Sequence, residues 1–511
     1  MSTSILSIYL GRLPAQVSFL GRIKGRRINL DGYPGTRRFK VFSRRSVKGN
    51  VLAQGTSKHA VLMIAVVSSF LTPFTSAAIN IALPTIGQEL SMDAVSLNWV
   101  ATAYLLPAAT FLMPLGRLAD ILGRKKVLQI GIVVDALAAI LCALAPSGGW
   151  LIAFRALQGL GGSMMFGNSA AILSSVFPPN ERGRALGLTV ASVYTGLTVG
   201  PLIGGVLTHR FGWQAVFLVD AILGVVITAV VFTRLKGEWA EAKGEPFDIL
   251  GSMLYCTGMV VLIYALSVLP AVWGFGLIAV ALAAIGAFVR WEARQQFPLI
   301  RVELFRDNAA FALSNLAALI NYSATFAVGL LLSLYLQYIG GYTPESAGLL
   351  LIAQPIMMVI CSPIAGHLSD RIAPRTVSSV GMALSTVGLA MLAFLGASVN
   401  LPWIVASLVV LGTGFGFFSS PNANAIMGSV DRKYYGVASG MMGTMRLTGQ
   451  ALSLGVVLLL FSVFIGRVAV TPANHEAFLQ AMRAAFIFSA AICFLGIFAS
   501  AARGRGQGPG R

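Results

Sequence analysis

Residues 116–126 read Gly-Arg-Leu-Ala-Asp-Ile-Leu-Gly-Arg-Lys-Lys and join two long apolar segments. A second stretch at residues 366–371 reads Gly-His-Leu-Ser-Asp-Arg and also joins two apolar segments. The leading glycine and the aspartate of the first stretch both recur 250 positions later. A loop that recurs with its spacing intact indicates an internal duplication, with one copy of the loop in each half of the chain.

The composition predicts that the bilayer is the main solvent of this chain. Of its 511 residues, 56% are hydrophobic and only 11% are charged, whereas soluble domains are about a quarter charged. This excludes a disordered chain, a collagen, a disulfide-stapled secreted domain and a nucleic-acid binder. Fourteen apolar runs are long enough to cross the hydrocarbon as helices: 61–83, 96–115, 127–146, 149–173, 185–208, 214–233, 248–267, 271–290, 309–332, 348–366, 376–396, 402–427, 436–465 and 481–502.

The distribution of basic residues predicts the topology. The first 58 residues hold twelve Lys and Arg against a single acid, Asp31, and most other cations fall in every second loop. Cytoplasmic loops carry such an excess of Lys and Arg, so we expect a multi-pass protein of the cell (inner) membrane with both termini in the cytoplasm. Residues 1–58 are interpreted as a basic, disordered cytoplasmic tail or as an over-long start of the chain.

The repeated loops also predict the domain organisation. They lie after the second and the tenth predicted helix, whereas a plain six-plus-six duplication would place the second copy after the eighth. We therefore expect an all-α polytopic membrane protein with two six-helix halves and two inserted helices. The predicted boundaries are 59–235 for the first half, 236–307 for the inserted helices with their loops, 308–502 for the second half, and 503–511 for a cytoplasmic tail.

Four motifs carry a family resemblance. The loop at 116–126 resembles the loop 2/3 signature of the major facilitator superfamily, and Leu151-x3-Arg155-x2-Gln158-Gly159-x-Gly161 resembles its helix 4 motif. Gly196-x3-Gly200-Pro201-x2-Gly204-Gly205 resembles its helix 5 antiporter motif, and Arg446 between Gly440 and Gly449 resembles a helix 13 signature of the fourteen-helix drug:proton antiporter branch. The resemblance implies the major facilitator fold and the export of amphipathic, drug-like compounds by proton antiport with alternating access.

One departure from that branch bears on the mechanism. Asn80-Ile81-Ala82-Leu83-Pro84 matches the end of the helix 1 motif of that branch. The motif normally begins with L-D-x-T, and in this chain Thr75 stands where its aspartate would be. If that carboxylate couples drug binding to protons in relatives, this chain must couple otherwise or carry a different substrate. The alternative is therefore a transporter of a specific metabolite with different or no proton coupling, and a third hypothesis is a sensor that transports nothing.

Burying an ionisable side chain in the hydrocarbon costs free energy, so each such residue within an apolar run is expected to have a functional or structural role. Asp135 lies near the middle of its predicted helix and is our first candidate for the proton carrier, with a structural partner role as the alternative. Arg155 is a candidate for proton coupling or for contact with an anionic substrate. For Arg446 the sequence favours neither of two alternatives, contact with substrate and helix packing. For Asp220 the sequence favours a structural role.

Other motif residues suggest gating and cavity roles. The duplicated loops predict an inner gate formed by Gly116, Asp120, Gly123, Arg124, Gly366, Asp370 and Arg371. Gly196, Gly200 and Gly204 lie on one helix face next to Pro201 and Gly205, which predicts a seal between helices or simply close packing. Polar residues in apolar helices, namely Asn80, Asn321, Gln337, Gln354 and Asn422, are predicted to line a watery cavity or to hydrogen-bond neighbouring helices.

The sequence excludes several chemistries. No Gly-Lys dipeptide occurs, so a Walker phosphate loop is missing. The four cysteines and four histidines are scattered, which predicts no metal site, no cofactor and no catalytic residues. The expected partners are a small-molecule substrate, protons and membrane lipids, without nucleic acid. A periplasmic adaptor would be a further partner, and nothing in the sequence bears on it.

Overall fold

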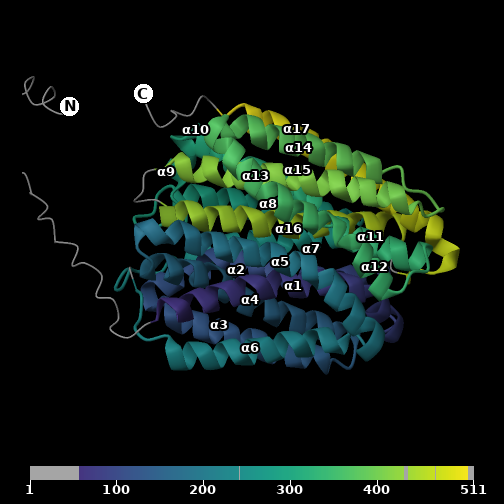
Figure 1. Ribbon diagram of the computed structural model, residues 1–511, viewed down its shortest axis with the longest axis horizontal. Helices are drawn as coiled ribbons and strands as arrows, with labels where there is room; N and C mark the ends of the chain where they lie inside the picture. Colours follow the sequence, from purple (N-terminus) through teal and green to yellow (C-terminus); the bar gives the residue numbers. More distant parts are fainter. Residues whose placement is uncertain (1–56, 241, 431–434, 467, 504–511) are drawn as a thin grey trace, which may run out of the picture. The chain divides into compact units, whose positions relative to one another are not determined.

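A computed structural model describes residues 57–240, 242–430, 435–466 and 468–503 (Figure 1). All but the last two residues of the predicted N-terminal tail lie outside these ranges, as do most residues of the predicted C-terminal tail. The helices are α1 (Lys58–Glu89), α2 (Ala94–Leu122), α3 (Arg124–Ala143), α4 (Gly148–Val176), α5 (Pro179–Phe211), α6 (Gln214–Arg234), α7 (Ile249–Val268), α8 (Val272–Glu292), α9 (Val302–Arg306), α10 (Ala309–Thr325), α11 (Val328–Leu334), η1 (Tyr335–Ile339), α12 (Pro344–Leu351), α13 (Ala353–Arg371), α14 (Pro374–Leu392), α15 (Leu401–Gly428), α16 (Tyr435–Phe464), η3 (Pro472–Asn474) and α17 (His475–Ala501).

Each of the fourteen predicted apolar runs coincides with helix in the structure. Two crossings are broken into consecutive helices: α10, α11 and η1 form one, and α12 and α13 form another. Thirteen helical stretches in the described ranges are long and apolar enough to span a membrane. The fourteenth, α4, has 29 residues and carries Arg155, Gln158 and Asn168. The prediction of an all-α polytopic membrane protein is confirmed.

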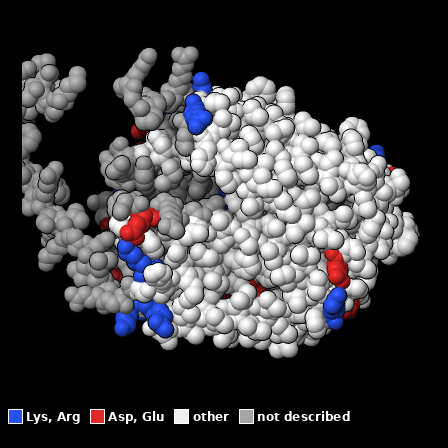
Figure 2. Space-filling model, viewed as in Figure 1, with Lys and Arg blue, Asp and Glu red and all other residues white. Residues whose placement is uncertain are grey.

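The surface fits a hydrocarbon solvent. Large apolar side chains such as Val272, Phe275, Ile222 and Phe498 are at least 60% exposed, which would be costly in water but is expected where lipid covers the helices. In the space-filling view, charged side chains gather toward the two ends of the helices, and most of the surface between them is uncharged (Figure 2). The helices therefore present an apolar band to lipid.

Helix packing divides the described chain into two groups. In the first, α1 packs on α5, α3 packs on α4 and α6, and α2 packs on α4. In the second, α14 and α13 pack on α15, α17 packs on α14, and α10 packs on α16. Figure 1 shows α1 and α3–α6 in the lower part of the view and α13–α15 with α17 in the upper part. Of the inserted helices, α7 packs on α2, α16 and α8, whereas α8 packs mainly on α7.

Polar residues set the helix starts where the chain turns back into the membrane. The carboxylate of Asp93 accepts hydrogen bonds from the backbone N–H groups of Val95 (3.0 Å) and Ser96 (2.9 Å) at the start of α2. Asp248 does the same for Gly251 (2.9 Å) at the start of α7. These caps satisfy donors that a helix terminus otherwise leaves without a partner.

The two groups touch along α2 and α16 and again where α1 ends. We call the end of α1 the far end, and the near end is where α1 begins. A methyl group at Gly205 of α5 would lie 2.6 Å from the carbonyl oxygen of Pro344, and one at Gly348 of α12 would lie 2.1 Å from that of Pro201. The Ser333 hydroxyl donates to the carbonyl oxygen of Asn80 at 2.6 Å. Between described residues, no hydrogen bond or ion pair joins the two six-helix groups at the near end. The closest described backbone contacts between the groups therefore lie at the far end.

The glycine motif of α5 serves close packing against α1. A methyl group at Gly196 would lie 2.6 Å from the carbonyl oxygen of Phe70, one at Gly200 would lie 2.9 Å from that of Phe74, and one at Gly204 would lie 2.5 Å from Cα of Ala78. None of these positions has room for a side chain. Because Gly205 and Pro201 meet α12 on the other side of α5, the motif belongs both to the packing within the first half and to the contact with the second half at the far end.

We expect Gly204→Ala to destabilise the protein, because overpacking of this kind costs about 1–3 kcal/mol. The matched control is Gly286→Ala in α8, where an added methyl group would meet nothing within 4 Å. Melting temperatures of the two purified variants in detergent should differ, with only Gly204→Ala below the wild type. Equal melting temperatures for all three proteins would contradict this account of the motif.

Candidate transport site

A buried polar network lies inside the first helical group, in the half nearer the far end. Arg155 of α4 is 1% exposed, and its Nε donates to the carbonyl oxygen of Val100 at 3.1 Å. Its Nη1 donates to Oε1 of Gln158 at 2.6 Å, and the guanidinium carbon lies 4.4 Å from the centre of the Tyr104 ring. The cation is therefore held by an amide, a carbonyl and an aromatic face, which together lower the cost of burying it.

The network continues to a carboxylate on α6. Nε2 of Gln158 donates to Oδ2 of Asp220 at 2.6 Å, and the Thr75 hydroxyl donates to Oδ1 at 2.7 Å. Asp220 is 1% exposed. Between described residues, no cation lies within ion-pair distance of this carboxylate. Its negative charge is therefore held mainly by two neutral hydrogen-bond donors.

Thr75 occupies the helix 1 position at which the fourteen-helix branch has an aspartate, and it contacts the carboxylate of Asp220 on α6 instead. The residue that departs from the helix 1 motif donates its hydroxyl directly to Asp220. The sequence favoured a structural role for Asp220, because it lies in the outer third of its predicted helix. No local pattern links α6 to α1, which are far apart along the chain. The available signal was the departure at Thr75 itself, since a lost buried carboxylate invites a replacement close by.

Asp135 lies near this network on α3. It is 4% exposed, and α3 approaches α4 so closely that a methyl group at Gly161 would lie 2.7 Å from the backbone nitrogen of Asp135. Its carboxylate makes no hydrogen bond to another described residue. The structure places Asp135 and Arg155 in the same helical group, whereas Arg446 belongs to the other.

Arg446 of α16 lies where the two groups face each other. Its guanidinium carbon is 4.3 Å from the centre of the Phe166 ring on α4. Nearby, the hydroxyls of Tyr194 on α5 and Ser419 on α15 are 2.9 Å apart. The predicted coupling residues therefore divide between two places, one inside the first half and one between the halves.

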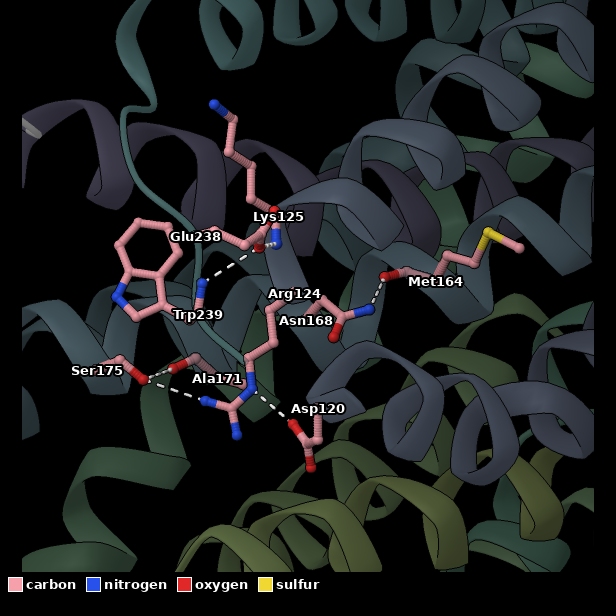
Figure 3. Close-up of polar contacts among 9 residues, drawn as sticks. All are labelled: Asp120, Arg124, Lys125, Met164, Asn168, Ala171, Ser175, Glu238 and Trp239. Atoms are coloured by element: carbon pink, nitrogen blue, oxygen red, sulfur yellow. Dashed lines mark hydrogen bonds and ion pairs between the residues drawn. The ribbon is translucent and has the colours of Figure 1, made fainter. Parts of the chain in front are cut away.

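The first predicted gate loop forms an ion pair of its own. Oδ1 of Asp120 accepts from Nε of Arg124 at 2.8 Å, and Nη1 of Arg124 donates to the hydroxyl of Ser175 on α4 at 3.1 Å (Figure 3). Gly123 has φ +121°, a conformation that side chains rarely adopt. Gly116 has open space around it. Asp120 and Arg124 thus tie the loop between α2 and α3 to the end of α4.

The linker between α6 and α7 closes over the same loop. The backbone N–H of Arg124 donates to the carbonyl oxygen of Trp239 at 2.8 Å, and that of Lys125 donates to Oε1 of Glu238 at 2.8 Å. Figure 3 shows Glu238 and Trp239 beside Arg124 and Lys125. Further along, Arg117 forms an ion pair with Glu245 at 2.5 Å. The linker therefore holds the gate loop from the near end.

The second predicted gate loop lies between α13 and α14. A methyl group at Gly366 would lie 2.9 Å from the hydroxyl oxygen of Ser420 on α15, and the amide of Asn424 donates to Ser369 at 2.9 Å. Arg371 is exposed, and the side chain of Asp370 lies outside the described part of the structure. The gate role of both loops stays a prediction.

The predicted cavity amides have different environments. The amide of Gln337 donates to the backbone carbonyl of Ile81 at 3.0 Å, and the backbone carbonyl of Asn80, not its amide, accepts from Ser333; both contacts join the halves at the far end. Asn321 is fully buried and its amide atoms have no described partner. The side-chain oxygen of Asn422 is likewise buried without a described partner, whereas the backbone carbonyl of Gln354 packs on Gly412.

Two helical groups that pack on each other and hold buried charges at membrane depth are the architecture of many secondary transporters. The profile of the Major Facilitator Superfamily matches residues 65–454 and 314–506. The chain belongs to this superfamily of transporters, and the predicted resemblance is confirmed.

Named relatives cover most of the chain. The riboflavin transporter RibZ of Clostridioides difficile is 28% identical over 86% of this chain and 96% of its own length. The multidrug resistance protein Stp of Mycobacterium tuberculosis is 31% identical over 74% of this chain and 71% of its own length. A solved bacterial homologue of the human lysosomal transporter Spinster, inward-facing and unoccupied, covers 88% of this chain and 97% of its own, with a TM-score of 0.64 and 14% identity. The last similarity supports the fold alone.

We expect Asp120→Asn to reduce transport while leaving the protein folded, because it removes the charge that holds Arg124 in the gate loop. The measurement is export of rhodamine 6G, a cationic xanthene dye, and of sulforhodamine B, an anionic one, from cells with matched protein levels. The control is Asp307→Asn, which removes an ion pair with Arg306 (3.0 Å) on exposed side chains. Wild-type transport by a well-expressed Asp120→Asn variant would contradict the gate role.

Proposed function

We propose that this protein is a secondary active exporter of amphipathic organic compounds, driven by proton antiport in the cell membrane with both termini in the cytoplasm. Relatives named for multidrug resistance and for tetracenomycin C export support the export of such compounds. The observation that carries the antiport is the hydrogen bond between Thr75 and Asp220. It supplies helix 1 with a buried carboxylate neighbour in place of the aspartate that the branch normally has there.

The network suits a carboxylate that gains and loses a proton. When ionised, Asp220 accepts from Thr75 and Gln158. When protonated at Oδ1, it can donate to Thr75, because a hydroxyl both donates and accepts, while Gln158 still donates to Oδ2. Both states keep their hydrogen bonds. What changes is the local charge, since the buried cation of Arg155 is then no longer balanced by Asp220.

Asp135 remains the other candidate for the proton. It is buried near Tyr104, Arg155 and Asp220, so a charge on one carboxylate disfavours a charge on the other. We propose that Asp135 and Asp220 together hold the transported proton and that protonation changes the charge balance at Arg155.

Alternating access then follows from charge. A proton taken up from the outer side leaves the first half with excess positive charge, which its buried position makes unfavourable. Rocking of the halves exposes the network to the cytoplasm, where the proton leaves and the substrate enters. The gate loops at Asp120 and at residues 366–371 would close the cytoplasmic side when the halves open outward.

A second candidate function is the transport of one specific metabolite, favoured by the similarity to a riboflavin transporter over 96% of that relative's length. Such a protein would need no proton gradient. The two functions differ in whether a pH gradient drives movement of the substrate.

We expect Asp220→Asn to abolish pH-driven dye movement in proteoliposomes, because the amide cannot carry a proton between the two sides. Dye exchange without a gradient should continue, since the hydrogen bonds to Thr75 and Gln158 can re-form on an amide in part. The double variant Thr75→Asp/Asp220→Asn should recover some pH-driven movement, because it returns a carboxylate to helix 1 at the same place.

Asp135→Asn is tested in parallel and should lower pH-driven movement as well. Dye movement by the wild type that ignores the gradient would reject antiport and favour the metabolite transporter. Gradient-driven movement that survives both asparagine variants would keep antiport and place the proton elsewhere.

A further inference from the structure

Arg446 is half-buried and, unlike the fully buried Arg155, has no amide or carbonyl partner among the described residues. Arg155 donates to a carbonyl and to Gln158. Arg446 makes no hydrogen bond to any described residue, and its Nε is buried without a partner. An arginine within a membrane helix is energetically costly when no protein group partners it.

The surroundings of Arg446 are aromatic and neutral. The ring of Phe166 lies 4.3 Å from its guanidinium carbon. The ionisable groups that interact with it are the phenols of Tyr194 and Tyr322, which are uncharged at neutral pH. Tyr322 in turn packs edge-on against Phe415 at 5.4 Å between ring centres. No carboxylate among the described residues balances the charge of Arg446.

The position of Arg446 suits a transported molecule. It is eleven residues into α16 from the near end, roughly 16 Å along the helix. One turn earlier, a methyl group at Gly443 would lie 3.6 Å from a carbon of Phe166, in ordinary contact, so α16 and α4 leave room for a small group there. The near end, from which a cytoplasmic compound would arrive, is the end without described polar contacts between the halves.

We propose that Arg446 binds an anionic group of the exported compound, such as a carboxylate, sulfonate or phosphate ester, while an adjacent aromatic part packs among Phe166, Tyr194 and Tyr322. This rests on the proposed function and names its substrate class as amphipathic organic anions. A guanidinium fork matches such oxyanions through two parallel hydrogen bonds.

The site also links binding to the rocking of the halves. Arg446 belongs to α16 in the second half, whereas Phe166 and Tyr194 belong to α4 and α5 in the first. When an anion binds Arg446, its hydrogen-bonded ion pair replaces the weaker cation–π contact of the guanidinium with the Phe166 ring. Binding therefore weakens a contact between the halves.

The test uses the purified full chain in lipid nanodiscs with sulforhodamine B and rhodamine 6G, which share a ring system and differ in charge. Dye binding is followed by fluorescence anisotropy, without a pH gradient. We expect the wild type to bind the anionic dye at least ten-fold more tightly than the cationic one. Arg446→Gln should weaken binding of the anion at least ten-fold and leave that of the cation unchanged or improved.

Two further variants separate recognition from folding. Arg446→Lys keeps the charge without the fork and should bind the anion with intermediate affinity. Phe166→Leu should weaken both dyes, because it removes the aromatic surface alone. The control is Arg306→Gln on α9, whose side chain is 77% exposed and which should bind both dyes as the wild type does.

Three results would overturn the proposal: no binding of sulforhodamine B to the wild type, tighter binding of the cationic dye, or equal weakening of both dyes by Arg446→Gln with a lowered melting temperature. Because binding is measured without a gradient, its outcome is separate from that of the antiport test. A protein that binds the anion but moves it without regard to pH would keep this inference and reject proton antiport.

Discussion

A guanidinium inside a hydrocarbon layer must find its partners within the protein, and Arg155 is the charge around which the first half is arranged. Its carbonyl partner comes from α2 and its amide partner from α4, and that amide leads to Asp220 on α6 and Thr75 on α1. Four helices thus share one chain of hydrogen bonds. Removal of any member would leave a buried polar group without a partner, which is costlier than the bond itself.

The halves are held differently at their two ends. At the far end, glycines on α5 and α12 let backbones touch, and Gln337 and Ser333 reach carbonyls of α1. At the near end, the described polar contacts of Asp120, Arg124 and Glu238 stay within the first half and its linker and do not reach the second half. The closest described backbone contacts between the halves are therefore those at the far end.

Much of the fold was predictable because the bilayer constrains it so strongly. Every predicted apolar run became helix, since a spanning segment must satisfy its backbone internally. The close packing of Gly196, Gly200 and Gly204 followed from their spacing. The role of Asp220 did not, because its partner Thr75 is 145 positions away, and no local pattern reports which helices adjoin. The linker over the gate loop was missed for the same reason.

The sequence by itself determined the membrane setting, the number of crossings and the duplicated loop, since hydrophobic length, helical period and spacing are properties of consecutive residues. Only the tertiary structure decided which charges meet. It brought Thr75 to Asp220, left Arg446 facing Phe166 without a described counter-ion, and paired Asp120 with Arg124 rather than with the other half. The physical reason is that electrostatic and hydrogen-bond energies act over a few ångströms of space, whereas a sequence records only distance along the chain.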